Sequence, residues 1–175
     1  MSLGSGWRVH ELPRVPARDG IAELLKESVH RSRLLLGSLG SGWTLVLTNG
    51  PLGTDLGVLP SRAARDLKVQ ALRATAVQPG LDHFPAAILE VFDPSSADPQ
   101  LCARNVYAAN DGGRWTFGEY GVRLPFEDVA RYEARSVRDR LTAAMIRKYV
   151  AAFDVGSTGD VRFVHLVENG DLVDE

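Results

Sequence analysis

The chain has few of the residues and segments that indicate a particular chemistry or cellular location. Its 175 residues include one cysteine, Cys102, which excludes intramolecular disulfides and cysteine-based zinc sites. Lysine is also scarce: of the 20 lysine and arginine residues, only Lys26, Lys68 and Lys148 are lysines. No apolar run reaches the roughly 18 residues of a transmembrane helix, and the first residues lack the apolar stretch of a signal peptide. We therefore expect a cytoplasmic protein.

Neither charge nor motif points to a nucleic acid, a membrane or a cofactor. The formal net charge is −2, which gives no electrostatic basis for binding a polyanion. The glycine-rich segment Gly37–Gly42 follows a predicted helix, whereas a phosphate loop leads from a strand into a helix. No two histidines lie within four residues of each other; they are His10, His30, His83 and His165. We expect no cofactor and no metal.

The clearest local pattern predicts a β-hairpin. Asn110, Asp111, Gly112 and Gly113 stand between two runs rich in Val, Tyr, Trp, Thr and Phe. Asn, Asp and Gly tolerate the positive φ angles of a tight turn, and the flanking residue types suit a half-buried strand. This pattern speaks to architecture more than to chemistry.

Other segments alternate or concentrate apolar residues in the manner of strands. The predicted strands are 7–12 as an edge strand ended by prolines, 43–48, 71–77 and 86–92, with a short helical turn at 62–68. Residues 161–167 form either a last strand or a docked tail.

Helical spacing predicts three helices. One runs over 19–36 with Asp19 as its N-cap, and one runs over 126–140 with acidic residues in its first turn. A third begins after Thr142, which is a good N-cap, and continues the apolar stripe Val137–Phe153 that we expect in the core.

Together these segments predict an α+β fold in a single domain. An antiparallel sheet would pack against an N-terminal helix and a C-terminal helical segment, because the strands cluster between the two. We place this domain at residues 1–155. Residues 156–175 would be an acidic C-terminal extension.

The candidate partner-binding residues are arginines and one aromatic. Arg131, Arg135 and Arg138 are spaced at i, i+4 and i+7, so a helix would place them on one face. That face is either a set of forked donors for carboxylates or phosphates on a partner or a solvated surface. Arg114 lies on the strand face opposite Trp115 and Phe117, which we expect to be core, and Tyr120 follows on the hairpin.

The block Asn110–Phe153 carries a resemblance. Its Asp-Gly-Gly-Arg-Trp, Leu-Pro-Phe-Glu and Arg-Asp-Arg motifs resemble the C-terminal part of actinobacterial proteins of the polymorphic-toxin immunity type. The resemblance covers about a quarter of the chain. It implies a bacterial protein that neutralises a toxin, and it brings no catalytic residues.

These observations lead to three hypotheses. The first is a non-enzymatic cytoplasmic binding protein, an immunity protein that covers the active site of a cognate toxin. The second is a small enzyme or ligand-binding domain, for which Asp82, His83, Cys102 and Arg104 would have to converge on a pocket. The third is a structural module of an oligomer. Any partner is expected to be a protein, with no role for nucleic acid or membrane.

Overall fold

The computed structural model of the chain describes residues 7–24, 33–39, 41–48, 57–78, 84–156 and 158–168. It confirms an α+β fold, because helices accompany two sheets in which neighbouring strands are antiparallel. The chain divides into two compact units, one joining Met1–Asp55 to Val155–Glu175 and the other formed by Leu56–Asp154. The predicted division into a domain at 1–155 and an extension at 156–175 stays a prediction.

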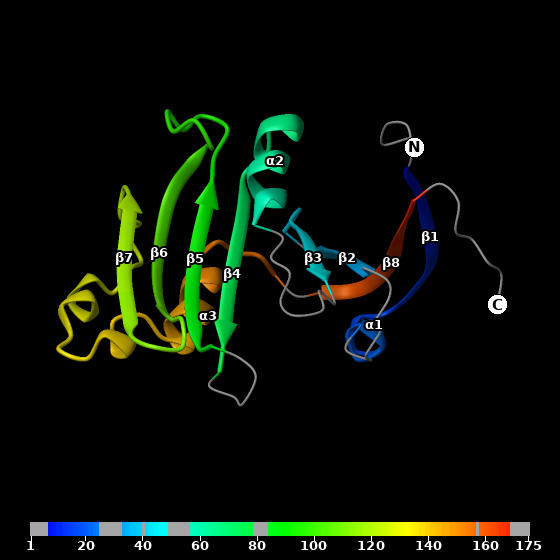
Figure 1. Cartoon of the computed structure of the whole chain (residues 1–175). Coiled ribbons are helices and arrows are strands. Elements are labelled where there is room, and N and C mark those ends of the chain that lie inside the picture. Colours follow the sequence, from blue (N-terminus) through cyan, green and yellow to red (C-terminus); the bar gives the residue numbers. More distant parts are fainter. Residues whose placement is uncertain are drawn as a thin grey trace. The chain divides into compact units, whose positions relative to one another are not determined.

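The first unit contains a four-stranded sheet in the order β1-β8-β2-β3 (Figure 1). Its elements are β1 (Trp7–Pro16), α1 (Ala17–Leu24), β2 (Arg33–Leu39), β3 (Thr44–Thr48) and β8 (Thr158–Glu168). β1 is the predicted edge strand, although it continues through the prolines expected to end it. Residues 161–167 belong to a strand, because β8 pairs with β1 on one side and with β2 on the other.

The predicted helix over 19–36 is wrong in its C-terminal part. α1 ends at Leu24, and Leu35 and Leu36 lie on β2, paired with β3 and β8. Consecutive leucines match a helical face, but they also suit a strand that has neighbours on both edges. Leu35 is buried with Leu24 in the small core of this unit. Pairing with β3 and β8 therefore makes residues 33–39 a strand. Residues 25–32 of the predicted helix lie outside the described residues.

The second unit contains a four-stranded meander in the order β4-β5-β6-β7 (Figure 1). Its elements are α2 (Val58–Leu67), β4 (Ala71–Val77), β5 (Ala86–Phe92), β6 (Cys102–Asn110), β7 (Trp115–Gly121), the 3-10 turns η2 (Val129–Glu133) and η3 (Val137–Asp139), and α3 (Ala143–Ala152). The strands predicted at 71–77 and 86–92 are confirmed as β4 and β5, and the predicted hairpin is confirmed as β6 and β7. Asn110 pairs with Trp115 at the hairpin end, and Gly112 in the turn has φ +96°.

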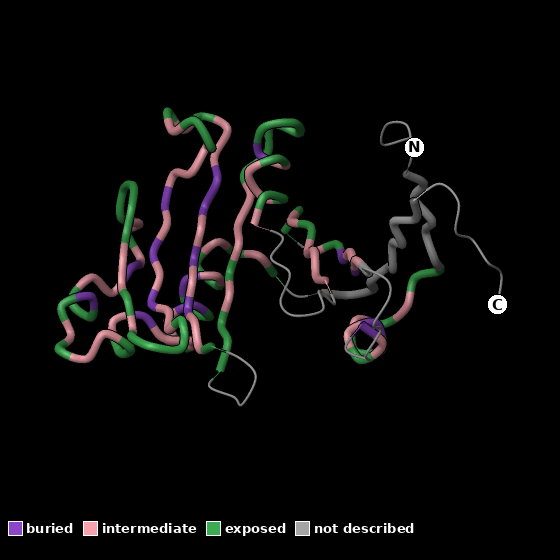
Figure 2. The backbone as a smooth tube through the Cα atoms, viewed as in Figure 1, coloured by how far each residue is buried: buried purple, intermediate pink, exposed green. Residues whose placement is uncertain are grey.

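One face of this sheet carries the core of the second unit, and α3 lies behind the strands in Figure 1. The buried apolar residues of β5 and β6 on this face belong to the stretches coloured purple in Figure 2; they are Ala87, Leu89, Val91, Val106 and Ala108. They pack with four buried residues that follow β7, namely Tyr132, Leu141, Ile146 and Tyr149. Trp115 and Phe117 pack against the same cluster, as their shared strand face predicts.

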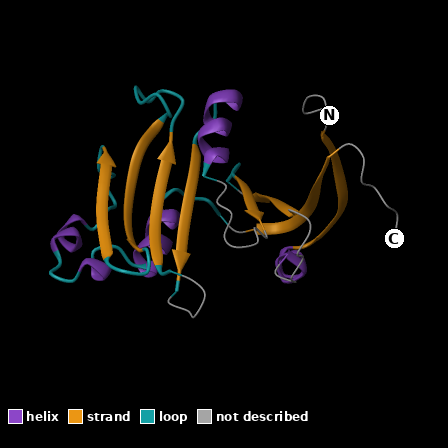
Figure 3. Cartoon of the chain, in the orientation of Figure 1, coloured by secondary structure: helices purple, strands orange, loops and turns teal. Residues whose placement is uncertain are grey.

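The predicted helix over 126–140 is wrong. Two 3-10 turns, η2 and η3, take its place (Figure 3). Ala134 between them has ψ 140°, which is not a helical value. Side chains of this segment form hydrogen bonds with distant residues: Glu127 with Arg104, and Tyr132 with Tyr149. These tertiary contacts take the place of the i to i−4 hydrogen bonds of a regular helix. The predicted N-cap is confirmed, because the Thr142 side chain accepts a hydrogen bond from the Met145 amide at 3.3 Å, where α3 begins.

Gly121→Ala should destabilise the second unit by about 1–3 kcal/mol, because Gly121 has φ +84° and a Cβ there would meet the carbonyl oxygen of Ala103. Gly113→Ala is the matched control, since its Cβ would meet only an Asp111 side-chain oxygen at 3.7 Å. Urea unfolding followed by fluorescence measures both in a Trp7→Phe/Trp43→Phe background, where Trp115 is the remaining tryptophan. Equal unfolding midpoints for the two variants would contradict the expectation.

Candidate functional site

The second unit contains a buried charged cluster centred on Arg104, whose side chain is 1% exposed. Strand alternation places Arg104 on the core face of β6, where its Nε and Nη2 donate to the two carboxylate oxygens of Glu127 at 2.8 and 2.6 Å. Nη2 also donates to Glu119 at 2.7 Å, and Nη1 donates to the carbonyl oxygens of Tyr120 and Gly121 at 3.2 and 3.5 Å. The guanidinium is thus surrounded by acceptors.

Glu127 connects this arginine to the segment that follows β7. Its carboxylate accepts hydrogen bonds from the Leu124 amide and the Tyr132 hydroxyl, both at 2.8 Å. The Tyr132 hydroxyl lies 3.4 Å from that of Tyr149, which accepts a bond from the Asp128 amide at 2.8 Å. We call Arg104, Glu119, Glu127, Tyr132 and Tyr149 the Arg104 cluster.

The electrostatics of the cluster hold its charges in place. Burial alone would lower the pKa of Arg104 and raise that of Glu127, but their mutual hydrogen bonds shift both pKa values the other way, so both stay charged. Arg123 and Arg104 lower the pKa of Glu119 to about 2. Burial, and hydrogen bonds to Tyr149 and Glu127, raise the pKa of Tyr132. None of these shifts brings a group into the neutral range.

The structure does not place Arg131, Arg135 and Arg138 on one face of a regular helix. Arg131 lies in η2 and Arg135 follows Ala134, and both are exposed. Neither side chain has a hydrogen bond or ion pair within the described part of the chain. Arg138 is exposed beside Asp139, with 3.7 Å between Nε and Oδ1. We call residues 128–135, which carry Arg131 and Arg135, the arginine segment.

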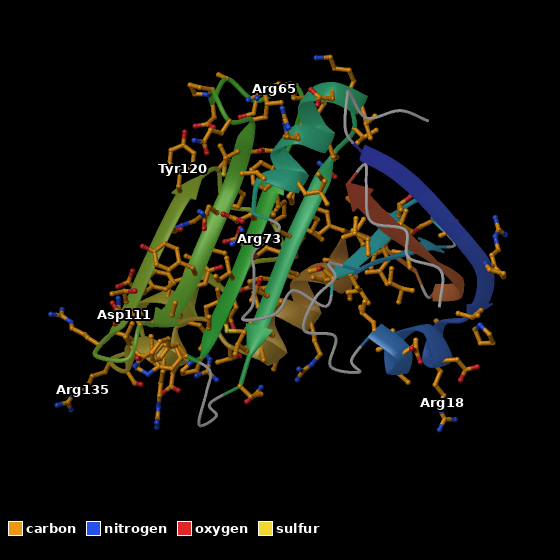
Figure 4. The ribbon with its side chains drawn as sticks, turned by 45° about the vertical axis from the view of Figure 1, so that its right-hand side comes forward. Arg18, Arg65, Arg73, Asp111, Tyr120 and Arg135 are labelled. Carbon is orange, nitrogen blue, oxygen red and sulfur yellow. The ribbon has the colours of Figure 1, made fainter. Side chains whose placement is uncertain are left out.

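The structure does not gather all predicted contact residues on one surface. Tyr120 and Arg135 lie at opposite ends of the second unit's sheet in Figure 4, with Asp111 near the Arg135 end. Tyr120 is 54% exposed and its hydroxyl donates to Asp98 at 2.9 Å. Arg114 is exposed directly after the hairpin turn.

The residues of the enzyme hypothesis are only partly described. Arg104 belongs to the buried cluster, and Cys102 lies two residues before it, partly buried. Burial and the nearby carboxylates of Glu90 and Asp98 raise the pKa of the Cys102 thiol, which favours its protonated, less nucleophilic form. Asp82 and His83 lie outside the described residues, so convergence of the four stays a prediction.

The partners of Arg104 are distant in the chain, and the sequence alone does not identify them. Arg104 alternates with Val106 and Ala108 on one strand face, and that pattern is the signal for a buried arginine that needs acceptors. Its main partner, Glu127, is 23 residues away and is one of the acidic residues in the first turn of the helix predicted over 126–140. No local pattern connects the two.

Comparisons with known proteins return no match. No protein-family model matches the chain, and neither a curated protein nor a solved structure matches it. Within the described ranges, no three His, Cys, Asp or Glu side chains are grouped to hold a metal ion. In the same ranges, no helix has the length and apolar character to cross a membrane.

Glu127→Gln should destabilise the second unit by about 3–5 kcal/mol, because it leaves Arg104 buried without its main counter-charge. Glu119→Gln should cost less, because the Glu119 side chain is 26% exposed and water can replace part of its interaction. Urea unfolding, followed by Trp115 fluorescence in the Trp7→Phe/Trp43→Phe background, compares the unfolding free energies of the two variants. A larger loss for Glu119→Gln would place the centre of the cluster elsewhere.

Acid should weaken the second unit through Glu119. Its folded-state pKa of about 2 lies below the ordinary 4.5, so its stabilisation is present above pH 4.5 and is lost as the pH falls towards 2. Glu119→Gln should therefore flatten the dependence of unfolding free energy on pH between about 4.5 and 2. Denaturant titrations at several pH values measure this slope, and an unchanged slope would contradict the expectation.

Proposed function

We propose that the chain is a non-enzymatic protein-binding protein of the immunity type, which neutralises a cognate toxin by covering its active site. One observation supports this proposal above the others. The buried ionisable groups of the second unit are occupied with one another, whereas Arg131 and Arg135 stand exposed without a partner among the described residues.

The Arg104 cluster suits a scaffold better than a catalytic centre. A general acid or base must reach its substrate and titrate near the working pH. The Glu127 side chain is fully buried, accepts bonds from three groups and has a lowered pKa. Tyr132 is 2% exposed and has a raised pKa. These properties favour a structural role.

The exposed arginines suit recognition of a protein. Arginine is enriched among the residues that dominate binding energy, and its planar fork pairs with carboxylates through two parallel hydrogen bonds. An inhibitor that displays such groups from a rigid segment loses little conformational entropy on binding. The resemblance of Asn110–Phe153 to toxin-immunity proteins agrees with this function.

Co-expression with the product of the adjacent gene tests the proposal, because an immunity protein is normally encoded beside its toxin. We expect that product to stop growth of a heterologous host, this chain to restore growth, and the two proteins to co-purify as a complex. An unrelated soluble protein expressed at the same level is the control. Growth arrest that this chain does not relieve, together with no complex, would refute the function.

A further inference from the structure

The arginine segment contains one buried side chain, that of Tyr132, which contacts the interior of the second unit. Tyr132 is 2% exposed and lies between the exposed residues Arg131 and Glu133. Its ring packs on Phe117 with 5.3 Å between centroids, and its hydroxyl donates to Glu127 at 2.8 Å. Because Tyr132 adjoins Arg131, these contacts constrain the backbone from which that arginine projects.

Three further bonds hold the backbone around both arginines. The Arg131 amide donates to the Asp128 carbonyl, and the Ala134 amide donates to the Arg131 carbonyl, both at 3.0 Å. The Nε of Arg140 donates to the Ala134 carbonyl at 2.9 Å, directly before Arg135. The guanidinium of Arg140 also lies 5.6 Å from the centre of the Phe117 ring. Both exposed arginines therefore start from ordered backbone.

We propose that Arg131 and Arg135 form the contact surface for an acidic patch on a partner protein, with Tyr132 as the positioning residue of this surface. This inference rests on the proposed function and names the chemistry that the partner must present. Carboxylates match the guanidinium groups of Arg131 and Arg135, which have no hydrogen bond or ion pair among the described residues. A nucleic acid is a weaker fit, because the chain carries a net charge of −2 and phosphate binding draws on many cations together.

Charge reversal tests the contact surface. Arg131→Glu/Arg135→Glu should weaken binding to the adjacent gene's product about tenfold or more. Arg147→Glu/Lys148→Glu is the matched control, because it makes the same charge change at exposed residues of α3 and should alter affinity less than about twofold. Surface plasmon resonance measures both, and equal losses for the two pairs would overturn the proposal. Arg131→Gln/Arg135→Gln repeats the test without added negative charge.

A probe of defined chemistry separates this inference from the proposed function. Poly-L-glutamate should bind the wild-type chain in a salt-sensitive manner, and Arg131→Gln/Arg135→Gln should abolish that binding even if the adjacent gene's product is no partner. Failure of the adjacent product alone refutes the immunity function and leaves the acidic-patch surface in place. Tighter binding of single-stranded RNA than of poly-L-glutamate would overturn the acidic-protein assignment.

Tyr132→Phe tests the positioning role, because it removes the hydroxyl and keeps the ring and both arginines. We expect the dissociation rate of the complex to rise several-fold, with an unchanged dependence of affinity on salt, since the number of paired charges stays the same. Hydrogen exchange at residues 128–135 should become faster by a larger factor than exchange in β5 and β6. An unchanged dissociation rate, or a changed salt dependence, would overturn the positioning role.

Discussion

The buried ion pair between Arg104 and Glu127 is the constraint on which the second unit depends. Removing two charges from water costs several kcal/mol per ion, and only close mutual contact with further hydrogen bonds offsets that cost. Here both carboxylate oxygens of Glu127 contact the guanidinium, and the Leu124 amide and Tyr132 hydroxyl complete the acceptor's bonds. The pair thereby determines where the chain after β7 must pass.

This constraint explains how a segment without regular helix can be ordered. The arginine segment has one 3-10 turn and a residue with a non-helical ψ, so its backbone bonds alone would hold it weakly. Tyr132 attaches it to Glu127 and to the aromatic ring of Phe117. The interior polar cluster and the exposed side chains of Arg131 and Arg135 therefore lie on two sides of the same short stretch of chain.

Local patterns account for much of the fold that the sequence predicted. The alternation in 71–77 and 86–92, the Asn-Asp-Gly-Gly turn and the Thr142 cap depend on neighbours in the chain, and each is present. The two predicted helices that failed had helical spacing in their apolar or charged residues. In 19–36 strand pairing overrode that spacing, and in 126–140 the bonds to Arg104 and its partners did so.

For the candidate site, the sequence by itself indicated that Arg131 and Arg135 could be exposed donors, because they lie on a polar segment, and it left open whether they bind a partner or only face solvent. It also determined the α+β class and the hairpin, since turn chemistry and strand alternation are local. Only the tertiary structure decided that β8 lies between β1 and β2, that Arg104 meets Glu127, and that Tyr120 is remote from Arg135. Such contacts join residues far apart in the chain, and their energies depend on burial and geometry that no local pattern encodes.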